Sequence, residues 1–235
     1  MNVKENSLKP VKKISLAQKI NVLRASVMGA NDGILSVAAI VIGVAGARTS
    51  SFAILVSGLA GMLAGTVSMA MGEYVSVNSQ KDAQRAATSK QATALEQDYA
   101  SEYQFVEQKY IAQGISPKLA QKATQEMMSG DALATVVRER YGFEIDEFTN
   151  PYAAAVASMI SFPLGSILPL VAITLLPKSI NIVGTFIAVA LALLITGYLA
   201  AKLGNADPKR GMLRNFVSGV ITMLVTFLMG YLVRL

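Results

Sequence analysis

The sequence predicts an all-α integral membrane protein with five transmembrane helices and a small cytosolic helical domain between helices 2 and 3. Of its 235 residues, 53% are hydrophobic and only 15% are charged, and the mean hydropathy is +0.46. Soluble domains are about one quarter charged. Five apolar segments each reach about the 20 residues that a helix needs to cross about 30 Å of hydrocarbon. They lie at about residues 25–47, 52–77, 152–176, 180–201 and 213–233.

The basic residues indicate how these segments cross the membrane. Ten lie before the first segment or between the fourth and fifth, and three lie on the opposite side. By the positive-inside rule the N-terminus is cytoplasmic, and an odd number of spans places the C-terminus outside. We expect the cell membrane of a prokaryote and, because the charge follows topology, no nucleic-acid partner. The larger set is Lys4, Lys9, Lys12, Lys13, Lys19, Arg24, Lys202, Lys209, Arg210 and Arg214, and the smaller set is Arg48, Lys178 and Arg234.

Eleven of the 15 acidic residues lie within 82–147, which therefore has a different composition from the spans. Apolar and aromatic residues recur at helical intervals over 82–113, which predicts a first helix there. Gly114 ends it, Ser116 caps a second helix, and Pro117 takes the first position of that helix. The second helix runs to about Gly130, and a third runs from its cap, Asp131, to about Tyr141. The predicted domains are a basic cytosolic tail (1–24), helices 1 and 2 (25–81), the cytosolic domain (82–149) and helices 3 to 5 (150–235).

The chain contains neither cysteine nor histidine. This excludes disulfides, thiolate metal sites, Ser-His-Asp and Cys-His catalysis, and histidine-ligated zinc or haem. Aspartyl intramembrane proteolysis needs two membrane aspartates, and the predicted spans contain one. We therefore predict that the chain is not an enzyme. Any metal it binds is held by oxygen atoms and methionine sulfur.

Two acidic residues lie within the predicted spans, Asp32 and Glu73. A carboxylate inside the membrane costs at least about 2.5–3.5 kcal/mol on insertion scales, so it is a functional hypothesis by default. Each lies eight residues inward of a basic residue, Arg24 or Lys81, which corresponds to a depth of about 12 Å. We expect the two carboxylates to converge. Met28 and Met69 each lie one helical turn from one of these acids, on the same face.

Carboxylate oxygens together with a thioether suit Fe²⁺ or Mn²⁺, whereas Mg²⁺ and Ca²⁺ prefer oxygen alone. The same carboxylates can carry protons, so cation and proton can compete for one site, as an antiporter requires. Other interpretations stay open. Asp32 could pair with a lysine or cap a backbone kink, the methionines could be packing residues, and Glu73 could reach the interface.

Small residues and prolines mark further positions in the spans. Asn31 and Gly33 flank Asp32 and could loosen the helix there, which would free carbonyls for coordination. Gly61 and Gly65 lie four residues apart, on a face suited to close helix contact or to generic packing. Pro163 and Pro169 are expected to kink the third span and expose backbone oxygens.

Three segments resemble the vacuolar iron transporter (VIT) family: Met28-Gly-Ala-Asn-Asp-Gly-Ile34, Leu63-Ala-Gly-Thr-Val-Ser-Met-Ala-Met-Gly-Glu-Tyr-Val-Ser-Val77 and Asn150-Pro-Tyr-Ala-Ala-Ala-Val-Ala-Ser158. The resemblance covers about residues 18–235. It implies five transmembrane helices, a homodimer with the metal path near its interface, and a cytosolic metal-binding domain. It also implies transport of Fe²⁺, and often Mn²⁺, out of the cytosol against protons. The family's transport aspartate corresponds to Asp32, its span-two methionine to Met69, and Glu73 lies in its Gly-Glu-Tyr position.

The chain departs from the family pattern at several acidic positions. Gly61 replaces a glutamate of eukaryotic members, and Gln91, Ala94 and Arg140 replace glutamates of the cytosolic domain. We expect that domain to keep its fold with reduced metal capacity. Its candidate ligands are Glu102, Met128 and Glu107.

The leading functional hypothesis is a divalent cation exporter with no permanently bound cofactor, in which Fe²⁺ or Mn²⁺ is the transported ion. We expect it to work as a homodimer in contact with membrane lipid, with protons as the counter-ion. The alternative is a membrane metal sensor or scaffold that does not transport.

Overall fold

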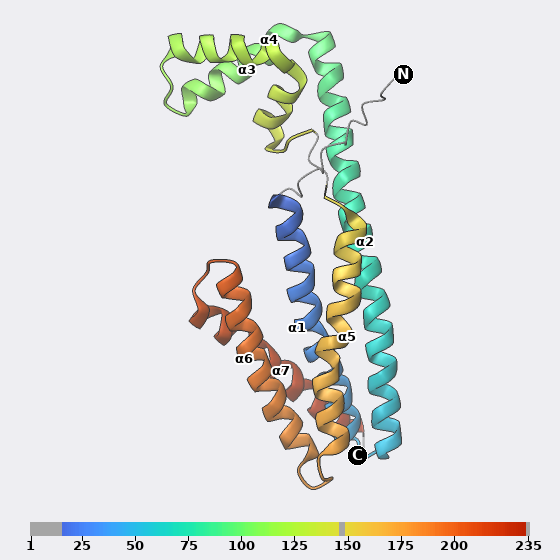
Figure 1. Ribbon diagram of the computed structural model, residues 1–235. Helices are drawn as coiled ribbons and strands as arrows, with labels where there is room; N and C mark the ends of the chain where they lie inside the picture. Colours follow the sequence, from blue (N-terminus) through green and yellow to red (C-terminus); the bar gives the residue numbers. More distant parts are fainter. Residues whose placement is uncertain (1–15, 146–148, 234–235) are drawn as a thin grey trace, which may run out of the picture. The chain divides into compact units, whose positions relative to one another are not determined.

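The computed structural model describes residues 16–145 and 149–233, and these residues form seven helices and no strand (Figure 1). The prediction of an all-α membrane protein is confirmed. The helices are α1 (Leu16–Gly46), α2 (Ser51–Gln97), α3 (Tyr99–Ala112), α4 (Pro117–Tyr141), α5 (Pro151–Leu175), α6 (Asn181–Leu203) and α7 (Pro208–Val233).

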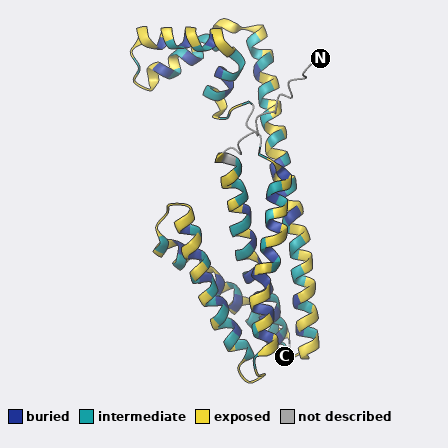
Figure 2. Ribbon diagram, viewed as in Figure 1, coloured by how far each residue is buried: buried dark blue, intermediate teal, exposed yellow. Residues whose placement is uncertain are grey.

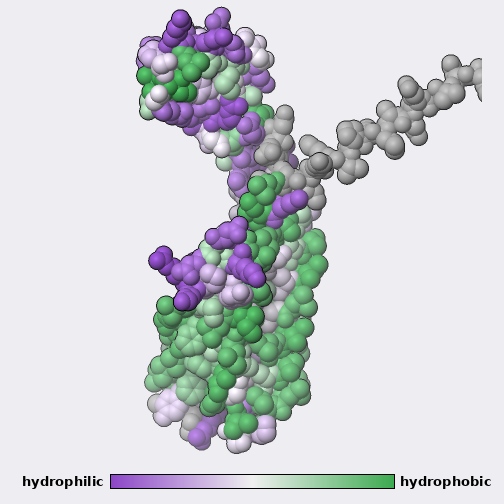
Figure 3. Space-filling model, turned by 60° about the vertical axis from the view of Figure 1, so that its left-hand side comes forward, coloured by the Kyte–Doolittle hydropathy of each residue, from purple (hydrophilic) through white to green (hydrophobic). Residues whose placement is uncertain are grey.

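Five of these helices, α1, α2, α5, α6 and α7, are long and apolar enough to cross a membrane. Their outward faces are apolar as well, as the green surface in Figure 3 shows. On α2, Leu63, Val67, Met71 and Val75 recur every four residues, and each is more than half exposed. A continuous apolar stripe of this kind is unfavourable in water and suits lipid or another apolar surface.

The chain divides into two compact units, one formed by residues 1–20 with 81–149 and the other by 21–80 with 150–235. α2 contributes to both, because it continues well past its apolar part to Gln97. The prediction of one helix over 82–113 was therefore wrong. Nothing between Val77 and Gln97 is a glycine or proline, so the helix does not end until Asp98. The Asp98 carboxylate accepts a hydrogen bond from the Ser101 backbone N–H at 2.9 Å and starts α3.

Within the 81–149 unit, α3 and α4 lie side by side (Figure 1) around a core of Val106, Tyr110, Ala120, Met128 and Val136. Gly114, with φ of 93°, makes the turn between them in a left-handed conformation that glycine adopts readily.

α4 is interrupted at Asp131, the residue that the sequence predicted as a helix cap. The backbone is non-helical at Asp131, and its carboxylate accepts a hydrogen bond from the Ala134 N–H at 2.9 Å, as a helix cap does. Pro117 takes the first position of α4, as predicted. Ser116 lies at the cap position, but its side chain makes no capping hydrogen bond.

The polar side of this unit is organised by Glu139, whose carboxylate is mostly buried. It lies 3.1 Å from the Lys109 ammonium and 3.2 Å from the Tyr110 hydroxyl. Burial raises the pKa of Glu139, but the hydrogen bonds from Lys109 and Tyr110 and the lysine charge outweigh it, so the net pKa lies below the ordinary value. The ionised form therefore stabilises the packing of α3 on α4.

Within the other unit, α1 and α5 approach until backbone meets backbone (Figure 2 shows buried residues along both helices). A Cβ on Gly33 would lie 2.0 Å from the Phe162 carbonyl oxygen, and one on Gly165 would lie 2.1 Å from the Ala30 carbonyl oxygen. The Ser166 hydroxyl, which is buried, donates hydrogen bonds to the Gly33 and Phe162 carbonyls. Small residues at a membrane helix interface allow this close packing.

α5 continues through both of its prolines as a single helix. Pro163 and Pro169 lack an N–H, so the Met159 and Gly165 carbonyls lose their usual helical donors. Phe162, next to Pro163, is almost completely buried and joins Val37, Val41 and Leu170 in the core cluster.

Replacing Gly165 with alanine should destabilise the membrane unit. The new Cβ would overlap the Ala30 backbone, and overpacking of this kind costs about 1–3 kcal/mol. We expect Gly165→Ala to lower the midpoint of thermal unfolding in detergent. Gly72→Ala is the matched control, because no heavy atom lies within 4 Å of its added Cβ. Alanine favours a helix over glycine by about 0.5–1 kcal/mol, so the control should hold or raise the midpoint. Equal shifts in both variants would contradict the close contact.

Replacing Glu139 with glutamine should loosen the α3–α4 pair at neutral pH, at a cost of about 1–3 kcal/mol for the partners left unsatisfied. Because the folded pKa of Glu139 is lowered, its contribution is fully present above the unfolded pKa and is lost as the pH falls through the folded pKa. Amide hydrogen exchange of α3 and α4 measures this. The protection factors, in which the intrinsic pH dependence of exchange is divided out, should fall in the wild type on acidification, and Glu139→Gln should reduce that dependence. The control is Glu126→Gln, whose side chain is 71% exposed; a comparable effect there would refute the assignment.

Candidate functional site

The Asp32 carboxylate lies on the outer face of α1 and is exposed. Val41 lies nine residues further along and is completely buried, and nine residues turn a helix by about 180°. The core therefore holds one face of α1 while Asp32 occupies the opposite one. The Ser36 hydroxyl donates a hydrogen bond of 2.6 Å to Asp32 Oδ1 from one turn along the same face. Across the described ranges 16–145 and 149–233, no cation lies within ion-pair distance of Asp32.

Glu73 has a different environment. Its side chain is buried and lies 2.9 Å from the Arg24 guanidinium. Arg24 also donates hydrogen bonds to the Asn21 side-chain oxygen at 3.1 Å and to the Met28 sulfur at 3.2 Å. A buried carboxylate needs such a partner, because leaving the charge unpaired costs several kcal/mol. Glu73 therefore joins α2 to the first half of α1.

Among the described residues the structure shows no direct contact between the Asp32 and Glu73 carboxylates, and their convergence stays a prediction. The positions of Gly58 against Val41 and Gly61 against Ile40 give the register of the antiparallel α1 and α2. Continued along both helices, this register places Asp32 level with Ser68 and Met69, about one turn from Glu73.

The two methionines lie in different surroundings. Met28 is 46% exposed and lies one turn from Asp32 on the outer face of α1. Met69 is half-buried and packs against the cluster that contains Val37 and Phe162. Neither sulfur is shown in contact with the Asp32 carboxylate, so their roles as metal ligands stay predictions.

Asn31 ties this part of α1 to two other spans. Its side-chain oxygen accepts hydrogen bonds from the Asn215 amide at 3.0 Å and from the Thr196 hydroxyl at 3.3 Å. These groups belong to α7 and α6. A polar side chain inside an apolar bundle needs such partners, and here they hold the residue that precedes Asp32.

Sequence reasoning missed four of these residues as partners. Ser36 could have been found, because it lies four residues from Asp32 and helical neighbours at that spacing share a face. Arg24 was interpreted only as the edge of a span. Thr196 and Asn215 were visible as polar residues in apolar segments, but nothing in the sequence joins them to Asn31.

The predicted packing glycines of α2 receive side chains from two other helices. A Cβ on Gly61 would lie 2.4 Å from Ile40 Cδ1, and one on Gly65 would lie 2.2 Å from Phe162 Cζ. These positions therefore hold α2 against α1 and α5, beside the stretch that carries Asp32.

The three predicted cytosolic ligands are not joined in one site within the described segments. Glu102 is ion-paired with Arg140 at 2.7 Å, and that guanidinium lies 3.9 Å from the centre of the Phe105 ring. Met128 is 3% exposed in the hydrophobic core, and Glu107 is half-buried. Those segments also hold no group of three or more acidic side chains arranged for a metal. Their roles as metal ligands stay predictions.

Comparison with known proteins gives consistent relatives. Residues 23–231 match the VIT family. The chain is 34% identical over 211 residues to "Vacuolar iron transporter" of Acanthamoeba castellanii, a match that covers 89% of this chain and 78% of that protein. It is 31% identical to "Vacuolar iron transporter homolog 2" of Arabidopsis thaliana, over 87% of this chain and 81% of the relative. For "Vacuolar iron transporter homolog 1" of Oryza sativa subsp. japonica, the identity is 34% and the coverages are 87% and 71%.

The matched region covers α2, α5 and α6 completely, most of α1 and nearly all of α7, and it includes Asp32 and Glu73. The resemblance predicted from the motifs around Asp32 and Glu73 is confirmed. The chain belongs to the VIT family.

Proposed function

We propose that this protein exports Fe²⁺ or Mn²⁺ from the cytosol in exchange for protons, as a homodimer in a prokaryotic cell membrane with its N-terminus cytoplasmic. The observation that carries the proposal is the Asp32 carboxylate, which lies within an apolar spanning helix, faces away from the core and has no cationic partner among the described residues. The basic segments before α1 and between α6 and α7 support the orientation.

The coarser function has support from family membership. The relatives are named as vacuolar iron transporters or their homologues, and this chain is a membrane protein of the same family. It is a metal-ion transporter, and the prediction that it is not an enzyme is confirmed.

Asp32 has the chemistry that cation–proton exchange needs. Its ionised oxygen atoms attract a divalent cation, and protonation removes that attraction. A cation bound at Asp32 replaces a proton, so the two ions occupy the carboxylate alternately. Ser36 orients one carboxylate oxygen and leaves the other available. Because Glu73 is already neutralised by Arg24, the exchange depends chiefly on Asp32.

A second copy of the chain would account for the exposure of Asp32. A carboxylate facing hydrocarbon is costly, so in the membrane this face of α1 must meet protein or enclosed water. A two-fold axis beside α1 would bring the same face of both copies together, because such interfaces use one patch twice. Two Asp32 side chains and two exposed Met28 side chains would then line one path.

Removing the charge of Asp32 should abolish metal flux. Vesicles that contain the purified protein are loaded with a metal-sensitive dye. They should take up Fe²⁺ or Mn²⁺ faster when the inside is more acidic than the outside, because protons then leave as the metal enters. We expect Asp32→Asn to reduce uptake to the level of empty vesicles for both ions.

Asp82→Asn provides the control, because this side chain is 74% exposed and lies on α2 beyond its apolar part. Uptake should match the wild type. Wild-type flux by Asp32→Asn would overturn the proposal, and flux that ignores the proton gradient would remove antiport from it.

Cutting the link between α7 and Asn31 should impair transport more than stability. Hydrogen bonds between membrane helices contribute about 0.6 kcal/mol on average, so Asn215→Leu should change the unfolding midpoint little. Uptake per folded molecule should fall severalfold, because Asn31 directly precedes Asp32. Thr222→Val is the control, since that hydroxyl bonds only to the Ser218 carbonyl within α7. Equal uptake by the two variants would show that the Asn31 contacts are structural only.

A further inference from the structure

The turn between α6 and α7 encloses a cavity of about 550 Å³ that the transport path does not use. Its walls are mostly small residues, including Ala200, Ala201 and Ala206, and its polar lining is Asp207, Arg210 and Arg214. Next to this cavity the two helices cross on glycines, where a Cβ on Gly197 would lie 2.6 Å from the Gly211 carbonyl oxygen.

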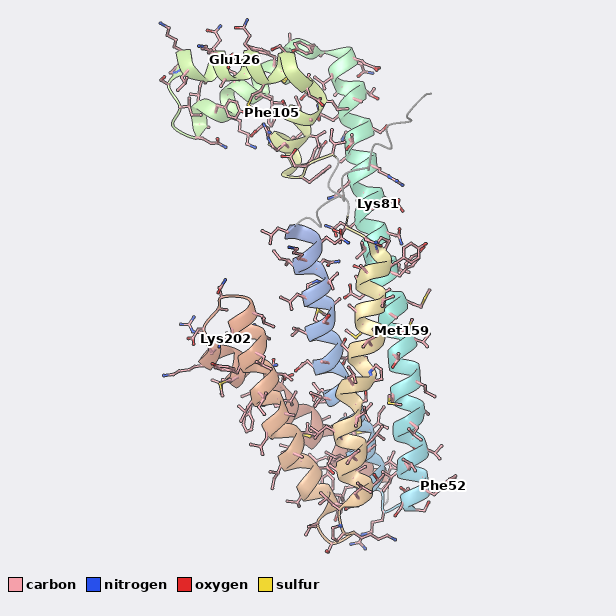
Figure 4. All side chains as sticks on the ribbon, viewed as in Figure 1. Phe52, Lys81, Phe105, Glu126, Met159 and Lys202 are labelled. Atoms are coloured by element: carbon pink, nitrogen blue, oxygen red, sulfur yellow. The ribbon has the colours of Figure 1, made fainter. Side chains whose placement is uncertain are left out.

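The cavity has an excess of positive charge. Arg214 is exposed and makes no ion pair or hydrogen bond among the described residues. The Arg210 side chain is 91% exposed, and its Nε lies 3.5 Å from Asp207 Oδ2. Lys202, labelled at the end of the α6–α7 hairpin in Figure 4, and Lys209 add two exposed cations to the same turn.

Asp207 neutralises this cluster only in part, because it is one carboxylate beside four cations, and it also caps the helix. Its Oδ1 accepts a hydrogen bond from the Lys209 N–H at 2.9 Å, and its carbonyl accepts one from the Gly211 N–H at 3.1 Å. The backbone N–H groups of Lys209 and Gly211, in the first turn of α7, therefore already have acceptors. An anion entering the cavity would be held by the arginine side chains, which suit phosphate because their planar groups offer several donors.

Exposed apolar residues lie close in the chain to the residues that line the cavity. Leu213 and Leu203 are 62% and 55% exposed, and Val217, one turn beyond Leu213, is 43% exposed. Arg214 therefore lies at the boundary between charged and hydrocarbon-compatible surface. A ligand that combines a phosphate with acyl chains matches both parts. Basic pockets between membrane helices are known to bind anionic head groups.

We propose that the α6–α7 cavity binds a phosphate group through Arg210 and Arg214, and that an anionic phospholipid supplies it with its chains along Leu213 and Val217. The site is separate from Asp32, and the proposal does not depend on the transport mechanism.

Binding is measured on the purified full-length protein in neutral detergent, by native mass spectrometry and by the thermal midpoint. The probes are cardiolipin, phosphatidylcholine and inorganic phosphate. The charge variant is R210Q/R214Q, and the matched control is K118Q/K178Q, which removes two exposed lysines outside the cavity. A third variant, Ala206→Leu, narrows the cavity without changing any charge.

Cardiolipin should bind the wild type and the control equally, and R210Q/R214Q should bind it roughly tenfold or more weakly, given the attraction that each arginine contributes. Ala206→Leu should also weaken binding. Phosphatidylcholine should not compete. Competition by inorganic phosphate at similar concentration would assign the site to free phosphate rather than lipid. An equal loss of cardiolipin binding in K118Q/K178Q would overturn the proposal, and so would undiminished binding by Ala206→Leu. If R210Q/R214Q does not fold, the result with Ala206→Leu decides.

Discussion

The close contact between α1 and α5 is the constraint on which the membrane unit depends. Gly33 and Gly165 bring each helix against a carbonyl oxygen of the other, and Ser166 adds a hydrogen bond across the same contact. Because this contact and the core beyond it occupy one side of α1, the opposite side stays free. Asp32 lies next to Gly33 in the chain but points away from the core. One glycine thus buries its helix face while the neighbouring carboxylate is left accessible.

Two polar side chains of the spans are held by partners on other helices, and a third remains accessible. Glu73 is held by Arg24, and Asn31 is held by Thr196 and Asn215. Both arrangements join helices, and both satisfy groups that would be costly if left alone in hydrocarbon. Among the described residues, the side-chain partner of Asp32 is the hydroxyl of Ser36. That difference, rather than the number of acids, distinguishes the residue suited to exchange a cation for a proton.

The 81–149 unit shows how charge substitution can preserve a fold while changing its chemistry. Arg140 stands where the family resemblance implied an acid, and it now holds Glu102 and covers Phe105. Glu139 is likewise bound by Lys109 and Tyr110. The carboxylates of this helical pair therefore stabilise α3 against α4, where the corresponding acids of a metal-binding domain would have to remain free.

The sequence alone determined the fold class, the five apolar spans, the family and the importance of Asp32, because hydropathy and an intramembrane charge are local properties. It also located the helix interruptions at Gly114 and Asp131, where backbone chemistry is local. Only the tertiary structure decided that Glu73 pairs with Arg24, that Asn31 joins α6 and α7, and that α2 continues to Gln97. The first two depend on register and on which helices become neighbours. The last agrees with the lack of glycine and proline between Val77 and Gln97, but helical spacing alone does not show whether two helical stretches form one helix.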